Sequence, residues 1–178
     1  MVYFKNKFTE DKATGFLPGT NLVPINLVIS HRLRVEINAQ CNLAMAALQS
    51  EKEHFTLEQY SITADPKQNS PQDMYAWPGL VMVAANTGRH YKNGMEYTIK
   101  AFLDGKVVLS GDSGEFQLTN VEFFKSLRLK YAITYASAQG ITIDGLLALH
   151  NTDHCYFNWK MLYVGSSRST ASNKLVVY

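Results

Sequence analysis

The stretch INLVISHRLRVEINAQCNLAMAALQ, residues 25–49, decides the fold class. Its first six residues, 25–30, are apolar and rich in β-branched side chains, which predicts a strand buried on both faces of a parallel sheet. From Arg32 to Gln49 the apolar residues recur at spacings of three and four, which predicts a helix. A strand that leads directly into a helix is half of a βαβ unit, so we expect an α/β fold.

The middle of the chain has a different pattern, in which short apolar runs alternate with the tight-turn dipeptides Asn-Gly, Asp-Gly and Gly-Asp. Such runs predict antiparallel strands joined by hairpin turns. Together they favour a small antiparallel barrel or meander of about fifty residues. The expected strands are residues 79–85, 95–103, 106–111 and 114–118.

The α/β pattern returns after Leu127. The expected elements are a strand or short helix at 131–135, a buried strand at 141–149, a helix at 157–166 and a closing strand at 175–178. We therefore predict an irregular lead-in over 1–24, an α/β lobe formed by 25–76 and 125–178, and a β-barrel inserted over 77–124. One further strand is expected near 59–63, within an otherwise polar connection.

Composition narrows the function classes. The 178 residues carry a net charge of +2, which excludes a protein dedicated to polybasic binding of nucleic acid or membrane surfaces. Any anion must therefore be bound by a few cations at specific positions. No apolar run of about 18 residues and no signal-peptide pattern is present, so we expect a soluble intracellular protein of nuclear, cytoplasmic or viral replication origin, with no membrane partner. The sequence also lacks G-x-x-x-x-G-K-[ST], the phosphate loop.

Metal chemistry is not favoured either. The two cysteines support neither a disulfide framework nor a zinc ribbon. His150, His154 and Cys155 form H-x-x-x-H-C, but the residues between the histidines are typical of a loop, so we expect no metal site. Trp77 and Trp159 adjoin apolar segments and are expected to pack in the core or between lobes.

Two segments near the end of the chain resemble motifs of superfamily 1 helicases of the PIF-type and RecD-type branch. YAITYASAQGITID, residues 131–144, is similar to Y-A-I-T-x-H-K-x-Q-G-x-T-x-D, and YVGSSR, residues 163–168, is similar to Y-V-A-x-S-R. Upstream, ISHRLRVEINAQCN, residues 29–42, resembles the fourth motif of the same branch. The barrel-like stretch resembles its SH3-like insert. The resemblance implies a second RecA-like lobe that carries a small inserted SH3-like β-barrel.

The resemblance also implies a nucleotide side, made of Arg32, Gln139, Gly140, Thr142 and Arg168. Arg168 is expected to be an arginine finger, because a guanidinium offered from a second lobe stabilises charge on the transferred phosphoryl group. A solvated surface arginine is the alternative. Arg32 is expected to be a second cation near the phosphate, with Arg34 as the competing candidate and a plain helix-surface charge as the third reading. Gly140 permits close backbone approach to a phosphate, and Gln139 could position the nucleotide.

The expected nucleic-acid side consists of Thr134, Arg89, Tyr91 and Lys92. Thr134 matches a family position that holds a phosphate of the single strand, and a plain β-branched strand residue is its alternative. Before the Asn-Gly turn lies a basic and aromatic tip, which either suits base stacking and phosphate contacts or is an ordinary hairpin loop. The tip consists of Asn86, Arg89, His90, Tyr91 and Lys92. Ala136 and Ser137 replace the usual His-Lys of the family, which removes an expected cation and ring.

We therefore expect the C-terminal part of an ATP-dependent DNA helicase, acting 5′ to 3′ by resemblance, in replication or repair. It needs an N-terminal lobe that supplies the phosphate loop and the acids for Mg²⁺, and it binds single-stranded DNA. The isolated chain is expected to be inactive as an ATP hydrolase. The alternatives are a non-catalytic module that binds nucleic acid or replication proteins, and a lobe of a viral RNA helicase.

Overall fold

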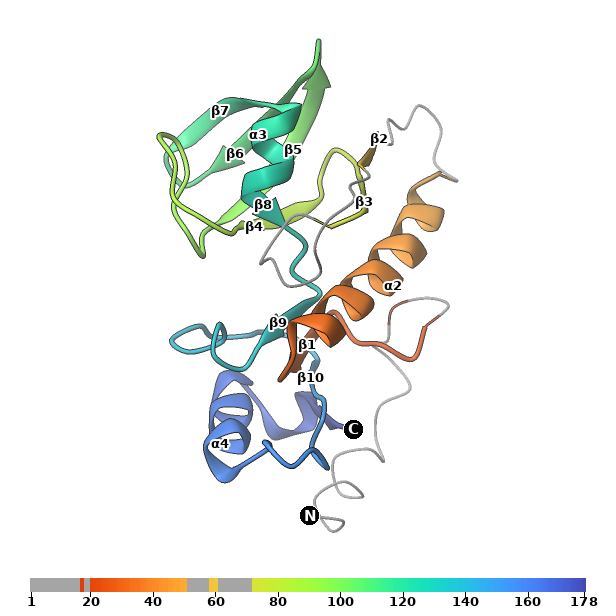
Figure 1. The fold of residues 1–178 in the computed structure, drawn as a ribbon, viewed down its shortest axis with the longest axis vertical. Helices are drawn as coiled ribbons and strands as arrows, with labels where there is room; N and C mark the ends of the chain where they lie inside the picture. The colour runs from red at the N-terminus through yellow and green to blue at the C-terminus, as the bar shows by residue number, and fades with distance from the viewer. Residues whose placement is uncertain (1–16, 18–19, 51–57, 61–71) are drawn as a thin grey trace. The chain divides into compact units, whose positions relative to one another are not determined.

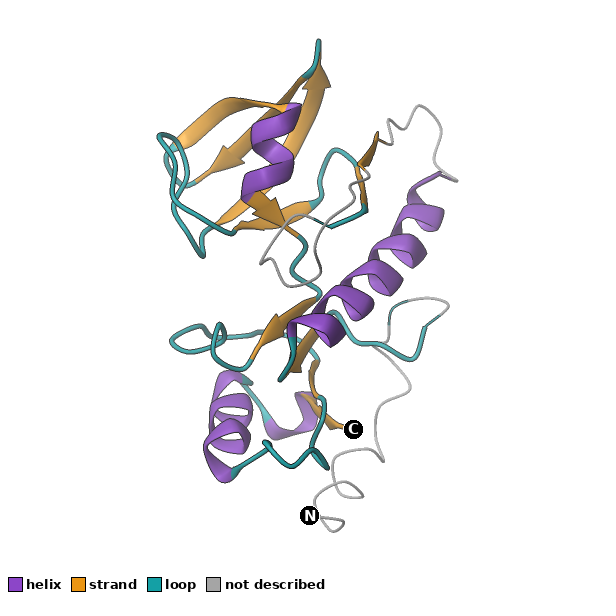
Figure 2. Cartoon of the chain, viewed as in Figure 1, coloured by secondary structure: helices purple, strands orange, loops and turns teal. Residues whose placement is uncertain are grey.

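The computed structural model describes Leu17 and residues 20–50, 58–60 and 72–178. Most of the expected lead-in and most of the polar connection lie outside these residues. Backbone contacts divide the chain into two compact units, Met1–Cys41 with Tyr131–Tyr178, and Asn42–Lys130. Figures 1 and 2 show the described elements of each unit.

The first unit contains a four-stranded parallel sheet, which confirms the expected α/β lobe. Its strand order is β11-β10-β1-β9. Leu27 in the central strand and Leu147 and Leu149 beside it are fully buried, as parallel strands covered on both faces require. The strands are β1 (Ile25–Val28), β9 (Ala132–Thr134), β10 (Leu147–Leu149) and β11 (Leu175–Val177).

Three helical segments accompany these strands in the sequence. They are α2 (His31–Ser50), α4 (Trp159–Arg168) and the 3₁₀ turn η1 (Ser172–Lys174). Helix α4 begins two residues later than expected, because the side chain of Asn158 caps it by accepting from the backbone N–H groups of Lys160 and Met161. A Cβ at Gly165 would lie 2.4 Å from Cδ2 of Leu149, so the glycine lets α4 pack closely on β10.

The expected strand at 141–149 was wrong over its first six residues, because only Leu147–Leu149 form β10. Gly145 has a φ of +131°, which interrupts extended backbone. Ile143 makes an isolated parallel bridge with Ser169 instead. The chain before β10 is therefore tied to the end of α4 rather than to the sheet.

Edge strand β9 is held from both sides. Its inner edge pairs with β1, and beside Ala132 the buried amide of Asn38 from α2 takes the place of a further strand. Asn38 Nδ2 donates to the Ala132 carbonyl at 3.1 Å, and its Oδ1 accepts from the Ala132 N–H at 2.9 Å. Both backbone groups of a buried edge residue are thereby satisfied.

A second buried amide, that of Asn26 in β1, holds an uncharged histidine. Asn26 Nδ2 donates to the carbonyls of Val23 and Tyr131, so its Oδ1 must accept from Nε2–H of His150 at 2.9 Å. The His150 ring stacks on Tyr178 with centroids 4.7 Å apart. Burial lowers the pKa of His150 to about 4.

The second unit contains a five-stranded antiparallel sheet of order β7-β6-β5-β4-β8, which confirms the inserted β module. The sheet continues past residue 124, the expected end of the insert, because β8 pairs with β4. A short helix that the sequence reading did not predict, α3 (Asn120–Ser126), precedes β8 and is opened by a capping box between Thr119 and Glu122. The strands are β4 (Val81–Ala84), β5 (Glu96–Leu103), β6 (Lys106–Gly111), β7 (Gly114–Thr119) and β8 (Leu127–Arg128).

A two-stranded antiparallel pair, β2 (Glu58–Tyr60) with β3 (Met74–Ala76), also belongs to the second unit. The amide of Asn42 binds the backbone of Tyr75 in β3 as Asn38 binds Ala132, accepting from its N–H at 2.7 Å and donating to its carbonyl at 2.8 Å. The remainder of the strand expected near 59–63 lies outside the described residues.

We predict that His150 makes the protein lose stability in mild acid. The unfolded histidine takes up a proton near pH 6.5 and the folded one only near pH 4, so protonation favours the unfolded chain between these values. The free energy of unfolding should fall across that window by up to about 3 kcal/mol. Urea unfolding at pH 7, 5.5 and 4 measures it, with His150→Gln as the non-titrating control. If wild type and variant lose stability in parallel, the assignment is wrong.

Candidate functional site

Arg168 is the last residue of α4 and is half-buried. Its Nη1 donates to the carbonyl of Ile141 at 3.1 Å, while Nε and Nη2 approach the hydroxyl of Ser167 at 3.4 and 3.1 Å. These acceptors are neutral. The guanidinium is therefore positioned against a specific loop, and within the described part of the chain it forms no ion pair.

That loop is the segment 139–142, which the same resemblance assigned to the nucleotide site. Gln139, Gly140 and Thr142 are all exposed, and Gly140 has a φ of +83°, which favours glycine. Directly after the loop, the Ile143 N–H donates to the Arg168 carbonyl at 2.8 Å. The structure thus brings the two helicase-like motifs together at the end of α4.

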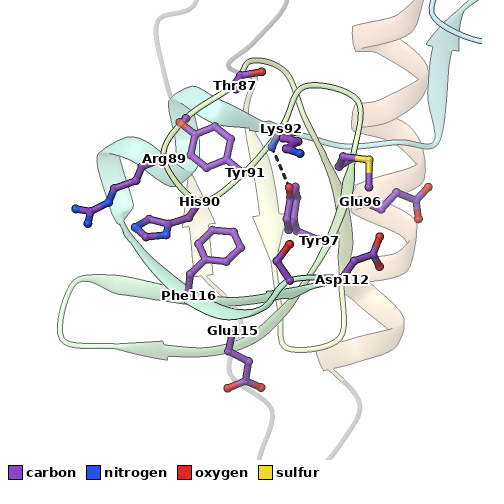
Figure 3. Close-up of a pocket in the computed structure, with 13 residues that line it drawn as sticks. Thr87, Arg89, His90, Tyr91, Lys92, Glu96, Tyr97, Asp112, Glu115 and Phe116 are labelled. Carbon is purple, nitrogen blue, oxygen red and sulfur yellow. Dashed lines mark hydrogen bonds between the residues drawn. The ribbon is translucent and has the colours of Figure 1, made fainter.

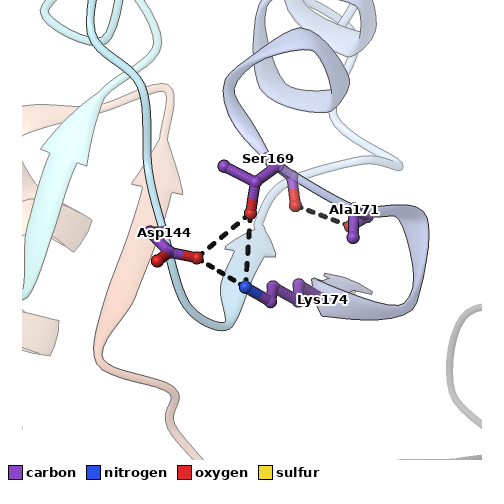
Figure 4. A network of polar contacts seen from close by, with 5 residues as sticks. Asp144, Ser169, Ala171 and Lys174 are labelled. Atoms are coloured by element: carbon purple, nitrogen blue, oxygen red, sulfur yellow. Dashed lines mark hydrogen bonds and ion pairs between the residues drawn. The ribbon is translucent and has the colours of Figure 1, made fainter.

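A polar network fixes the segments on either side of this contact (Figure 4). Lys174 Nζ lies 2.5 Å from Oδ1 of Asp144, and the Thr170 hydroxyl donates to the same oxygen at 3.2 Å. Hydrogen bonding from Lys174, and then from Thr170, holds the pKa of the Asp144 carboxyl below its ordinary value. Lys174 carried no signal in the sequence, because its partner is thirty positions away.

Arg32 does not join this group. It lies in the first turn of α2, directly after the carboxyl end of β1, whereas Arg168 precedes the amino end of β11. Because the strands are parallel, these positions lie at opposite edges of the sheet. Arg32 is exposed and pairs with Glu36 at 3.0 Å, and the competing Arg34 is buried at 2% exposure. A role for Arg32 beside a phosphate stays a prediction.

Thr134 ends β9 and is only 8% exposed. Its hydroxyl lies 2.9 Å from the hydroxyl of Ser137 and accepts from the Ser137 N–H at 3.2 Å. The group expected to hold a nucleic-acid phosphate therefore closes its own turn. Ser137, one of the two residues that replace the family's His-Lys, is the partner.

The basic and aromatic tip of the second unit lines a pocket of about 480 Å³ (Figure 3). Arg89 and Lys92 are exposed at its margin. Tyr91 is half-buried, its hydroxyl lies 2.7 Å from that of Ser126, and its ring lies so close to Gly88 that a Cβ there would be 2.4 Å away. Tyr91 thus packs the loop rather than offering a free ring face.

The aromatic faces of this pocket come from His90 of the tip and from two residues of the sheet. His90 stacks on Phe116 with centroids 5.8 Å apart, and Tyr97 meets Phe116 edge to face at 5.4 Å. Figure 3 shows the His90 and Phe116 rings facing each other. Phe116 and Tyr97 lie on β7 and β5, so only the sheet register brings them to the tip, and sequence reasoning missed them. The margin also carries the acids Glu96, Asp112 and Glu115.

The histidines and cysteines considered as metal ligands, His150, His154 and Cys155, do not form a metal site in the described residues. No group of three His, Cys, Asp or Glu residues gathers as ligands within the described part of the chain. His150 binds Asn26, while Nδ1 of His154 accepts from the Tyr156 N–H at 3.2 Å. Both cysteines are free, with Cys41 buried and Cys155 exposed. Among the described helices, none has the length and apolar character to cross a membrane.

Comparison with solved structures shows which known proteins share this fold. A structure of two coordinating Pif1 helicases unwinding forked double-stranded DNA matches 99% of this chain at a TM-score of 0.64 and 17% identity, covering 42% of that chain. The fold is that of one part of a Pif1 helicase. Pif1 from Bacteroides in complex with ADP-AlF3 and single-stranded DNA matches at 0.62 and 17% identity, and Pif1 from Candida albicans at 0.53 and 14% identity.

Those two matches cover 99% of this chain, with 44% and 48% of the Pif1 chains, so this chain spans less than half the length of the proteins it resembles. No protein-family model and no curated protein matches it. The expected RecA-like lobe with an inserted β module is confirmed at the level of the fold.

We predict that Lys174 controls the ionisation of Asp144 and the order of the neighbouring loop. Lys174→Met removes the cation, so the pKa of Asp144 should rise toward its ordinary value, and the Ile143 amide should exchange with solvent faster. NMR titration of the carboxyl and amide exchange measure both. Lys130→Met, which breaks the ion pair with Glu96 in the second unit, is the matched control. An unmoved Asp144 midpoint in Lys174→Met would contradict the network.

Proposed function

We propose that this chain is the C-terminal part of an ATP-dependent DNA helicase that moves 5′ to 3′. The observation that carries the proposal is the contact of Arg168 with the 139–142 loop, in a chain whose fold matches part of the Pif1 helicases. Fold alone does not define an activity, so the proposal depends on this pair of segments.

The arrangement suits the stabilisation of phosphoryl charge. In the structure the Arg168 guanidinium donates to a neutral carbonyl and a neutral hydroxyl. Phosphate oxygens are stronger acceptors for a guanidinium, because they are anionic and can accept two parallel N–H hydrogen bonds from it. Arg168 can therefore exchange these contacts for a nucleotide without breaking an ion pair. Exposed Gly140 and Gln139 lie on the adjoining loop, where backbone and amide donors could meet the same anion.

The proposed cofactor is ATP with Mg²⁺. The donor set in this chain fits the outer side of a triphosphate, with Arg168 as the finger and Gln139, Gly140 and Thr142 beside it. Bound ATP supplies the phosphoryl group to be hydrolysed, and a separate nucleotide-binding lobe would supply the phosphate loop and the metal-holding acids. Without that lobe the 178-residue chain should not hydrolyse ATP.

Single-stranded DNA is the proposed second ligand. Arg89 and Lys92 are free to meet phosphates at the tip of the β module, and the exposed His90 ring on Phe116 offers a face for a base. Tyr91 supports this tip by packing. Thr134 is proposed to contact the strand through the turn that it forms with Ser137.

A non-catalytic nucleic-acid module is the second candidate. It is favoured by Ala136 and Ser137, which lack the charge and ring of the family motif, and by the engagement of the Thr134 hydroxyl within its own turn. The two candidates differ in whether Arg168 matters for nucleotide turnover.

We predict that Arg168→Ala lowers DNA-stimulated ATP turnover by about 10³-fold or more when this chain is joined to a phosphate-loop lobe. Nucleotide affinity should change less than threefold, because the finger acts on transition-state charge. Arg168→Lys should recover little, since an ammonium cannot reproduce the guanidinium geometry. Steady-state turnover and nucleotide titration measure these values. Lys100→Ala, an exposed cation on β5, is the control and should leave turnover unchanged. A loss below threefold in Arg168→Ala would leave the non-catalytic module as the better candidate.

A further inference from the structure

The outer side of α4 and the turn that precedes it carry the three most exposed large hydrophobic side chains of the described residues. Trp159 is 73% exposed, Tyr156 71% and Tyr163 64%. All three fall within eight positions of the sequence. Trp159 therefore does not pack in the core, which was one of the two environments expected for it, whereas Trp77 is buried. Large aromatic groups left in water over one short segment mark an interaction surface.

These rings are separate from the proposed nucleotide contact. Successive helical residues are about 100° apart, so Trp159 and Tyr163 lie about 40° from each other. Arg168 lies about 180° from Trp159, on the same side as Met161 and Gly165, which pack toward the sheet. Trp159 and Tyr163 therefore face away from the 139–142 loop.

Lys160 is the charged residue of this segment. Residues 156–163 contain no Asp or Glu. Lys160 Nζ lies 6.0 Å from the centroid of the Trp159 ring, and the His154 ring lies 5.3 Å from that of Tyr156. A lysine beside exposed aromatic rings complements a ligand that carries both anionic groups and flat rings.

We propose that this α4 aromatic face, made of Tyr156, Trp159, Lys160 and Tyr163, binds single-stranded nucleic acid by base stacking. Four helical residues span about 6 Å, wider than the 3.4 Å step of a stacked duplex strand, so the spacing of Trp159 and Tyr163 suits an extended strand. Stacking on aromatic side chains tolerates any base, and Lys160 meets the phosphates. The inference shares its ligand class with the proposed function, but it places the strand on a different surface.

Trp159 itself provides the test. The full 178-residue chain is titrated with a dT oligonucleotide at low salt while tryptophan fluorescence is recorded, since Trp77 is only 4% exposed and Trp159 is open. The expected result is quenching on binding. By anisotropy of a labelled oligonucleotide, Trp159→Ala and Tyr163→Ala should each weaken binding about tenfold, and Trp159→Phe should retain it. Lys160→Ala should reduce the salt slope by about 1. Leu103→Ala, another exposed apolar residue, should leave binding unchanged.

Three outcomes overturn the inference. One is binding that is unaffected by Trp159→Ala and Tyr163→Ala and causes no quenching, which leaves the tip of the β module as the strand contact. Another is the absence of oligonucleotide binding. The last is self-association in sedimentation that Trp159→Ala abolishes, which would assign the face to a second copy. None of these alters the turnover expected of Arg168→Ala, so the failure of this inference and of the proposed function are distinguishable.

Discussion

The amide of Asn38 on the backbone of Ala132 is the contact on which the first unit depends. Strand β9 has three residues and would otherwise leave a buried edge unpaired. An unsatisfied buried N–H or carbonyl costs about 1 to 3 kcal/mol, so a side chain that satisfies both is a strong constraint. Strand β9 ends at Thr134, and the chain then continues to the 139–142 loop. By holding β9 in place, this amide also constrains where the loop can contact Arg168.

Local patterns predicted much of the fold. The apolar run in 25–30 and the helical spacing after it correspond to β1 and α2, and the tight-turn dipeptides correspond to the hairpins of the antiparallel sheet. Contacts between distant residues were not predictable. Asp144 meets Lys174 across thirty positions, and Gly145 interrupts a stretch whose apolar residues looked continuous. Helix α3 depends on a capping box whose pattern is short and common.

The candidate site likewise contains residues that the structure brings together and residues that it does not. The resemblance selected Arg168 and Gln139-Gly140, and their proximity follows from the bridge between Ile143 and Ser169. It also selected Arg32, which the structure pairs with Glu36. The composition of the hairpin tip selected Tyr91, which the structure packs within the loop of the β module. Helix α4 then has two functional sides in our account. Its inner side presents Arg168 to the loop, and its outer side presents the aromatic face to solvent.

The central claim is that Arg168 stabilises charge that develops on a transferred phosphoryl group. The affinity of ADP, measured with and without aluminium fluoride for this chain joined to a phosphate-loop lobe, tests it most directly, because the fluoride complex resembles the transition state. We predict that aluminium fluoride tightens ADP binding at least about 100-fold in the wild type and by less than about tenfold in Arg168→Ala. An equal gain in both proteins would contradict the claim.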